Sequence, residues 1–300
     1  MTAQRQGLLL CLVAATGFST TGIFAKLAYE SHASVTTVLA ARFVLTSVLL
    51  WLVVYRTGQP LPSRRLLLAG LLLGLVGYGL QVALLFVSLE RIDASLSSLS
   101  SLLFYSYPAM VTAGALLLGR ERTSIRRDAA LAISLVGVVL VFSGGAAHRD
   151  GLGVALSLAA ALIYAVLILI VDRIGSGVRP LVLSTLVSTG AAVTFVAGGL
   201  LLGNLQLDIA PEGWGAIVGL AIVATVVPLA AFYAGITRVG PSTASILLTV
   251  EPALTVLLAA IVLHERLGPL QFLGGALVLA AILILQLRSR VNMTAESNIS

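Results

Sequence analysis

Charged residues are scarce in this chain. Asp, Glu, Lys and Arg make up 10% of its 300 residues, whereas a soluble domain uses about 25% to cover its surface. Hydrophobic residues reach 59%, more than the interior of a chain of this length can bury. Most of the outer surface must therefore face lipid, and the composition excludes a soluble globular protein.

Several catalytic signatures are also missing. The single cysteine, Cys11, excludes an internal disulfide framework and a cysteine metal cluster, and it suits an inert position in a helix. No GxSxG motif occurs, and His264-Glu265 is not followed by the second histidine of HExxH. No phosphate-binding loop of the form GxxxxGKS/T is present, so ATP does not drive the protein directly. We predict no enzyme, no cofactor and no metal.

Ten apolar stretches come close to the roughly 20 residues that a helix needs to cross the hydrocarbon core. The first lacks an A-x-A-like cleavage site, so we interpret it as a retained spanning helix. The loops are short, so no soluble domain is inserted. The sequence predicts an all-α membrane protein with ten transmembrane helices over residues 8–28, 35–55, 66–89, 95–118, 126–146, 152–171, 181–202, 214–236, 242–263 and 268–287.

Basic residues are distributed unequally between the two sides of these stretches. If the amino terminus is cytoplasmic, thirteen of the 18 Lys and Arg residues fall in inner segments and three, Arg91, Arg149 and Arg266, in outer loops. This bias predicts a multi-pass protein of the plasma (inner) membrane with both termini in the cytoplasm. The net charge of +6 thus reflects orientation, and we predict contact with membrane lipid but not with nucleic acid.

The two halves of the chain resemble each other at an offset of 144–147 residues. Tyr107-Pro108 matches Glu251-Pro252, and the glycine pair Gly70/Gly74 matches Gly215/Gly219. We therefore predict one five-helix repeat over residues 1–147 and another over 148–300. Because five is odd, the second repeat enters the membrane inverted, as in many secondary transporters.

These motifs resemble those of the drug/metabolite transporter superfamily, specifically the ten-helix EamA-type transporters, which include bacterial amino-acid exporters. The resemblance covers nearly the whole chain. It implies a central cavity lined by helices 1, 3, 4, 6, 8 and 9, with helices 5 and 10 at the periphery. The residues that carry it are Ala41-Arg42-Phe43, Tyr107-Pro108 with Glu121, and Glu251-Pro252 with Glu265.

Polar and aromatic residues fall near the middle of several spans, judged at about 1.5 Å of helix rise per residue. Transporter sites lie at this depth on the repeat interface, and tyrosine is ordinarily found nearer the membrane surface. A wet cavity and hydrogen bonds to a neighbouring helix both explain such tyrosines. The predicted substrate-binding residues are Phe18, Tyr78, Gln81, Tyr105, Tyr107, Tyr164 and Glu251.

Glu251 is the strongest single candidate, because a carboxylate at the bilayer centre costs at least about 2.5–3.5 kcal/mol and must face a cavity or a partner. Three roles are open: binding a substrate ammonium, carrying a coupling proton, or capping backbone freed by Pro252.

Further residues are candidates for coupling or gating. Pro108 and Pro252 each remove a helix hydrogen bond and predict a kink, static or mobile. The long side chains of Arg42 and Lys26 favour snorkelling to water, with attraction of a substrate carboxylate as the alternative. Glu121 and Glu265 are expected to form ion pairs beside Arg122 and Arg266, one at each membrane face.

The sequence as a whole predicts a secondary transporter of small metabolites. An amino-acid exporter, aromatic or broad in range, working by alternating access suits a carboxylate beside aromatic side chains. The alternatives are a transporter of drugs, nucleosides or other metabolites, and a lipid-moving membrane protein. Monomer and homodimer are both open.

Overall fold

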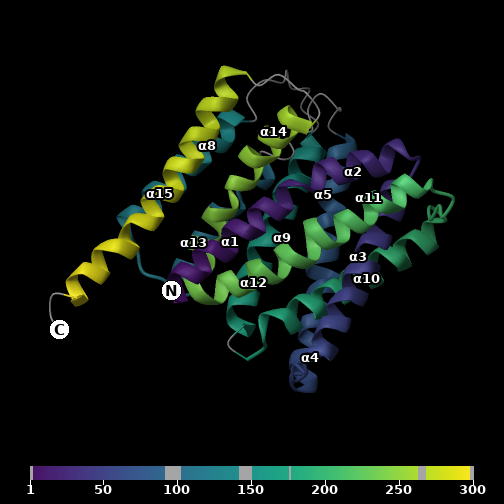
Figure 1. Cartoon of the computed structure of the whole chain (residues 1–300), viewed down its shortest axis with the longest axis horizontal. Helices are drawn as coiled ribbons and strands as arrows, with labels where there is room; N and C mark the ends of the chain where they lie inside the picture. Colours follow the sequence, from purple (N-terminus) through teal and green to yellow (C-terminus); the bar gives the residue numbers. More distant parts are fainter. Residues whose placement is uncertain (1–2, 92–102, 142–150, 176, 263–267, 298–300) are drawn as a thin grey trace.

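A computed structural model describes residues 3–91, 103–141, 151–175, 177–262 and 268–297, and within these ranges all regular structure is helical (Figure 1). The helices are α1 (Ala3–Ser19), α2 (Thr21–Glu30), α3 (Val35–Arg56), α4 (Arg64–Leu72), η1 (Leu73–Tyr78), α5 (Gly79–Arg91), α7 (Tyr107–Leu117), α8 (Ile125–Val141), α9 (Gly151–Ile174), α10 (Pro180–Leu202), α11 (Pro211–Ala221), η3 (Ile222–Val226), α12 (Val227–Val239), α13 (Pro241–Leu248), α14 (Val250–Val262) and α15 (Pro269–Ser297).

These segments confirm the ten predicted spans. The first span joins α1 to α2, the third joins α4, η1 and α5, the eighth joins α11, η3 and α12, and the ninth joins α13 to α14. Predicted residues 95–102, 142–146 and 263 lie outside the described ranges. The last helix runs ten residues beyond the predicted end, because residues 288–297 contain neither glycine nor proline to stop it. Helices long and apolar enough to cross a membrane cover Ala3–Glu30, Val35–Arg56, Arg64–Leu85, Gly151–Ile174, Pro180–Leu202 and Pro211–Val239.

The pairs of helices that pack together are the same when each span is replaced by its counterpart in the other half. In the first half α1 packs along α12, and in the second half its counterpart α9 packs along α5. Helix α3 packs along its own counterpart α10, and α8 along its counterpart α15. Exchanging span n with span n+5 therefore maps the pairings onto one another, as expected for two inverted repeats.

The pair formed by α8 and α15 lies at one edge of the bundle (Figure 1). This is the peripheral position expected for spans five and ten. The remaining spans surround the middle of the molecule, where the largest fully buried side chains include Tyr107, Tyr233 and Phe43.

Glycine allows close contact between the third and seventh spans. A Cβ at Gly74 in η1 would collide with the Val187 backbone of α10, and one at Gly70 would press on Leu186. In the matching pair of the second half, Gly215 faces open space, whereas a Cβ at Gly219 would meet the Phe24 ring. The small-residue spacing of the first half thus serves packing within the chain.

Candidate functional site

Spans four and nine are both interrupted beside a proline. Helix α7 begins at Tyr107 with Pro108 in its first turn, and α14 begins at Val250, two residues before Pro252. Proline lacks an N–H and its ring obstructs the preceding turn, so each proline begins a new helix segment. The regular helix is interrupted near both prolines, over residues 105–106 in span four and at Thr249 in span nine.

A hydroxyl side chain satisfies a carbonyl at each break. Ser106 Oγ donates to the Leu103 carbonyl at 2.7 Å, and Thr249 Oγ1 donates to the Ile246 carbonyl at 2.6 Å. The backbone N–H of the same residue, Ser106 or Thr249, also donates to that carbonyl, at 3.1 Å in both cases. The two breaks are thus constructed in the same way.

Glu251 lies in the first turn of α14, where the partial positive charge of a helix N-terminus stabilises a carboxylate. The Tyr105 hydroxyl donates a hydrogen bond to this carboxylate, and the Arg42 guanidinium interacts with it electrostatically. The side chain is half-buried.

An aromatic cluster lies beside this carboxylate. The rings of Tyr107 and Tyr164 meet edge to face at 4.8 Å between centroids. Phe104 lies 5.4 Å from Tyr107 and 5.5 Å from Tyr164, and Tyr105 lies 6.1 Å from Tyr107. The buried Tyr107 hydroxyl has no hydrogen-bond partner in the described part of the chain.

Arg42 does not snorkel to water, and that expectation was wrong. Its side chain is buried, with Nε donating to Thr225 Oγ1 at 2.7 Å and Nη2 donating to the Ala224 carbonyl at 3.2 Å. Both acceptors belong to η3, whose π-helical winding leaves backbone groups outside the regular ladder. The guanidinium also lies 5.2 Å from the centre of the Phe43 ring. Lys26, in contrast, is exposed on α2.

The remaining candidates come from the other spans around the centre. Tyr78, at the end of η1, contacts Phe43 edge to face at 5.6 Å. Gln81 on α5 and Phe18 on α1 are also buried. Both were predicted to lie near the middle of their spans. The candidates other than Arg42 and Lys26 thus come from spans one, three, four, six and nine.

Sequence reasoning missed two aromatic residues. Tyr233 on α12 is 1% exposed, and its hydroxyl lacks a hydrogen-bond partner among the described residues. It lies close to the end of the predicted eighth span, so a search by depth did not select it. Phe104 was also missed, although it lies near the middle of the predicted span 95–118 and beside Tyr105 and Tyr107.

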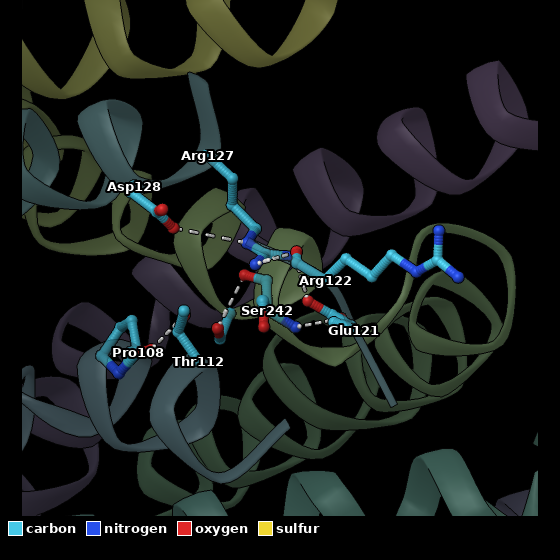
Figure 2. A network of polar contacts seen from close by, with 8 residues as sticks. Pro108, Thr112, Glu121, Arg122, Arg127, Asp128 and Ser242 are labelled. Atoms are coloured by element: carbon cyan, nitrogen blue, oxygen red, sulfur yellow. Dashed lines mark hydrogen bonds and ion pairs between the residues drawn. The ribbon is translucent and has the colours of Figure 1, made fainter. Parts of the chain in front are cut away.

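A polar network ties three spans together at the face of the bundle where α1 begins (Figure 2). Glu121, after α7, accepts hydrogen bonds from Arg127 of α8 and from the Ser242 backbone N–H of α13, the latter at 3.3 Å. The expected partner Arg122 contributes only its carbonyl, which accepts from Arg127 Nη2 at 2.8 Å. Arg127 replaces Arg122 because the first turn of α8 returns toward α13. The expected pair of Glu265 and Arg266 lies outside the described residues.

A second contact joins span four to span six at the same face. Arg120 Nη1 donates to the Leu169 carbonyl at 2.6 Å and to Asp172 Oδ2 at 3.3 Å, both on α9. The adjacent residues Arg120 and Glu121 therefore contact two different spans of the second half, spans six and nine.

A bundle of broken, paired spans around a buried group of polar and aromatic side chains defines a multi-pass membrane transporter. The chain belongs to the EamA-like transporter family, whose pattern matches residues 5–143 and again residues 151–287. The two matches support the duplication that the helix packing shows.

Individual relatives agree with this assignment. The chain is 26% identical over 281 residues to the uncharacterized transporter YcbK of Bacillus subtilis, covering 89% of this chain and 88% of that protein. It is 31% identical over 172 residues to the threonine/homoserine exporter RhtA of Escherichia coli, covering 56% of this chain and 55% of that protein. A solved crystal structure with 16% identity superposes with a TM-score of 0.81, covering 95% of this chain and 97% of that one, and shows the same fold.

Proposed function

We propose that this transporter exports amino acids or closely related small solutes by alternating access. The observation that carries the proposal is a half-buried carboxylate, Glu251, that meets the Tyr105 hydroxyl and the charge of Arg42 beside an aromatic cluster. A carboxylate at this depth attracts a solute ammonium, and aromatic faces accept both a cation and an apolar side chain.

The two charged groups of such a solute would contact different side chains. Its ammonium would lie at Glu251, within reach of the unpartnered Tyr107 hydroxyl. Its carboxylate would be drawn by Arg42, whose Nε and Nη2 are already held by η3. An immobile guanidinium supplies long-range attraction at no further cost in side-chain entropy. The threonine/homoserine exporter among the relatives favours the same solute class.

The duplicated architecture supports the mechanism. In an inverted pair of repeats, residues 1–147 and 148–300, each half can adopt the shape of the other, and the central site then opens to one side at a time. The breaks at Pro108 and Pro252 give spans four and nine separate segments that can move relative to each other. The contacts of Arg120 and Glu121 would close the face that carries the amino terminus, which the bias of basic residues makes cytoplasmic.

The test is counterflow in proteoliposomes. Purified protein is reconstituted, loaded with an unlabelled amino acid, and given a panel of labelled amino acids, nucleosides and cationic drugs outside. We expect accumulation of at least one amino acid above that of empty liposomes. Accumulation of only another solute class would refute the amino-acid proposal and retain the transporter, and movement of labelled lipid alone would favour a lipid-moving protein.

A further inference from the structure

A basic pocket lies at the same face as the Glu121 network and is separate from the central site. It has a volume of about 370 Å³ and is lined by Gln4, Leu8, Arg122, Thr123, Ser124, Arg126, Arg127, Thr243 and Ile284. The lining contains three arginines and no acidic residue. Four different spans contribute, through α1, α8, α13 and α15.

Three helix N-termini converge on this pocket. Gln4 lies in the first turn of α1, Arg126 and Arg127 in that of α8, and Thr243 in that of α13. A helix N-terminus carries a partial positive charge and unpaired N–H groups, so cations there are unfavourable unless an anion is close. Glu121 supplies the anion at the start of α13, where it accepts a hydrogen bond from the Ser242 N–H. The same carboxylate also forms an ion pair with Arg127.

Positive charge remains after that pairing. The guanidinium groups of Arg122 and Arg126 are exposed and make no ion pair within the described ranges, and Arg122 joins the contacts of Figure 2 only through its backbone. Arg127 Nε is buried without a hydrogen-bond acceptor, its nearest carboxylate oxygen on Asp128 being 3.8 Å away. The pocket thus presents two arginines without an ion pair in the described ranges, together with several hydroxyl groups.

We infer that this pocket binds a phosphate group, and that an anionic lipid headgroup supplies it. Arginine pairs with phosphate oxygens in two-point geometry, and the Thr123, Ser124 and Thr243 hydroxyls add donors. Leu8 and Ile284 offer apolar surface to the adjoining acyl chain. Basic pockets between spans on the cytoplasmic side suit such headgroups, and a free phosphate ion would use the same chemistry.

The test measures lipid affinity in detergent micelles, with phosphatidylglycerol and phosphatidylcholine titrated onto the purified full chain and bound lipid counted by native mass spectrometry. The pocket variant is Arg122→Gln/Arg126→Gln. The matched control is Arg64→Gln/Arg65→Gln, which removes two exposed arginines from the start of α4 at the same face but outside the pocket. An Arg122→Lys/Arg126→Lys variant preserves charge should the glutamine variant be poorly folded.

Wild type and the control are expected to prefer phosphatidylglycerol. Each basic residue near an anionic lipid is worth about fivefold in affinity, so the glutamine pocket variant should bind roughly 25-fold more weakly, and the lysine variant should keep most of the affinity. Inorganic phosphate that binds with the same dependence on the pocket arginines, while lipid does not, would assign the site to a free anion and overturn the lipid source. Equal losses in pocket variant and control, or no loss in either, would overturn the site.

Discussion

Spans four and nine are alike in backbone and different in chemistry. Both begin a new helix segment beside a proline, and in both a hydroxyl at the interruption donates to the carbonyl three residues earlier. Yet Tyr107 precedes the proline of the first half and Glu251 that of the second. The duplicated scaffold has therefore kept its breaks and changed the side chain at each.

This difference follows from electrostatics. Tyr107 and Glu251 are near enough to interact, and two carboxylates in their places would repel strongly where the dielectric constant is low. With a tyrosine at one position and a glutamate at the other, only one carboxylate lies there, and it is close to the Tyr105 hydroxyl and Arg42. The two inverted halves thus share an interrupted span and differ in the side chain that precedes its proline.

The strongest way to break the comparison is Tyr107→Glu, which makes the two positions alike. A second buried carboxylate without a partner is expected to lower the free energy of unfolding by about 3–5 kcal/mol. The measurement is unfolding in mixed micelles. A free energy of unfolding equal to that of wild type would mean that side chains at positions 107 and 251 do not interact electrostatically.

Arg42→Gln removes the cation that faces Glu251. It leaves the carboxylate less compensated and frees the acceptors of η3, with an expected loss of about 3 kcal/mol of unfolding free energy. The matched control is Lys26→Gln, an exposed cation on the neighbouring span, with an expected change within about 0.5 kcal/mol. Equal effects of the two changes on the unfolding curve would argue against a structural role for the buried guanidinium.

Glu251→Gln tests the chemistry of the second half while preserving shape. Losing the charge that meets the solute ammonium should cost about 2 kcal/mol, or roughly 30-fold in transport at low solute concentration. Counterflow of the transported amino acid gives the measurement, and Glu212→Gln, an exposed acid at the start of α11, should transport normally. Full activity of the Glu251 variant would remove the carboxylate from the proposed site.

Gly74→Ala tests the close contact of η1 with α10, with Gly215→Ala as a glycine change in open space. The added Cβ would meet the Val187 backbone of α10, so at least about 1 kcal/mol of stability should be lost. Gly215→Ala faces open space and should not destabilise the protein. Thermal unfolding of both variants in the same detergent decides, and a stable Gly74 variant would contradict the close contact of spans three and seven.

The smallest effect on folding is expected for Tyr107→Phe. Its hydroxyl has no partner among the described residues, so removal should change stability by less than about 0.5 kcal/mol. A lost hydrogen bond to the solute of about 1 kcal/mol would raise the KM for transport about fivefold. An unchanged KM would mean that this hydroxyl does not touch the solute.

Hydropathy alone was sufficient to predict the spans, because lipid demands long apolar helices and leaves few alternatives. Spacing also located Pro108, Pro252 and the central tyrosines. The fate of Arg42 was not predictable, since the acceptors that hold it arise from π-helical winding at Thr225, 183 residues away in sequence. Tyr233 was not predicted for a related reason. Depth counted along a regular helix does not identify which side chains meet at the centre of the bundle.

The central claim is that the site around Tyr107 and Glu251 opens to each side of the membrane in turn. It is tested by Tyr107→Cys in a Cys11→Ser background, which leaves one cysteine, treated with membrane-impermeant thiol reagents from either side of oriented vesicles. Alternating access predicts labelling from both sides, slowed from both by the transported solute. Labelling from one side only, or from neither, would contradict the account.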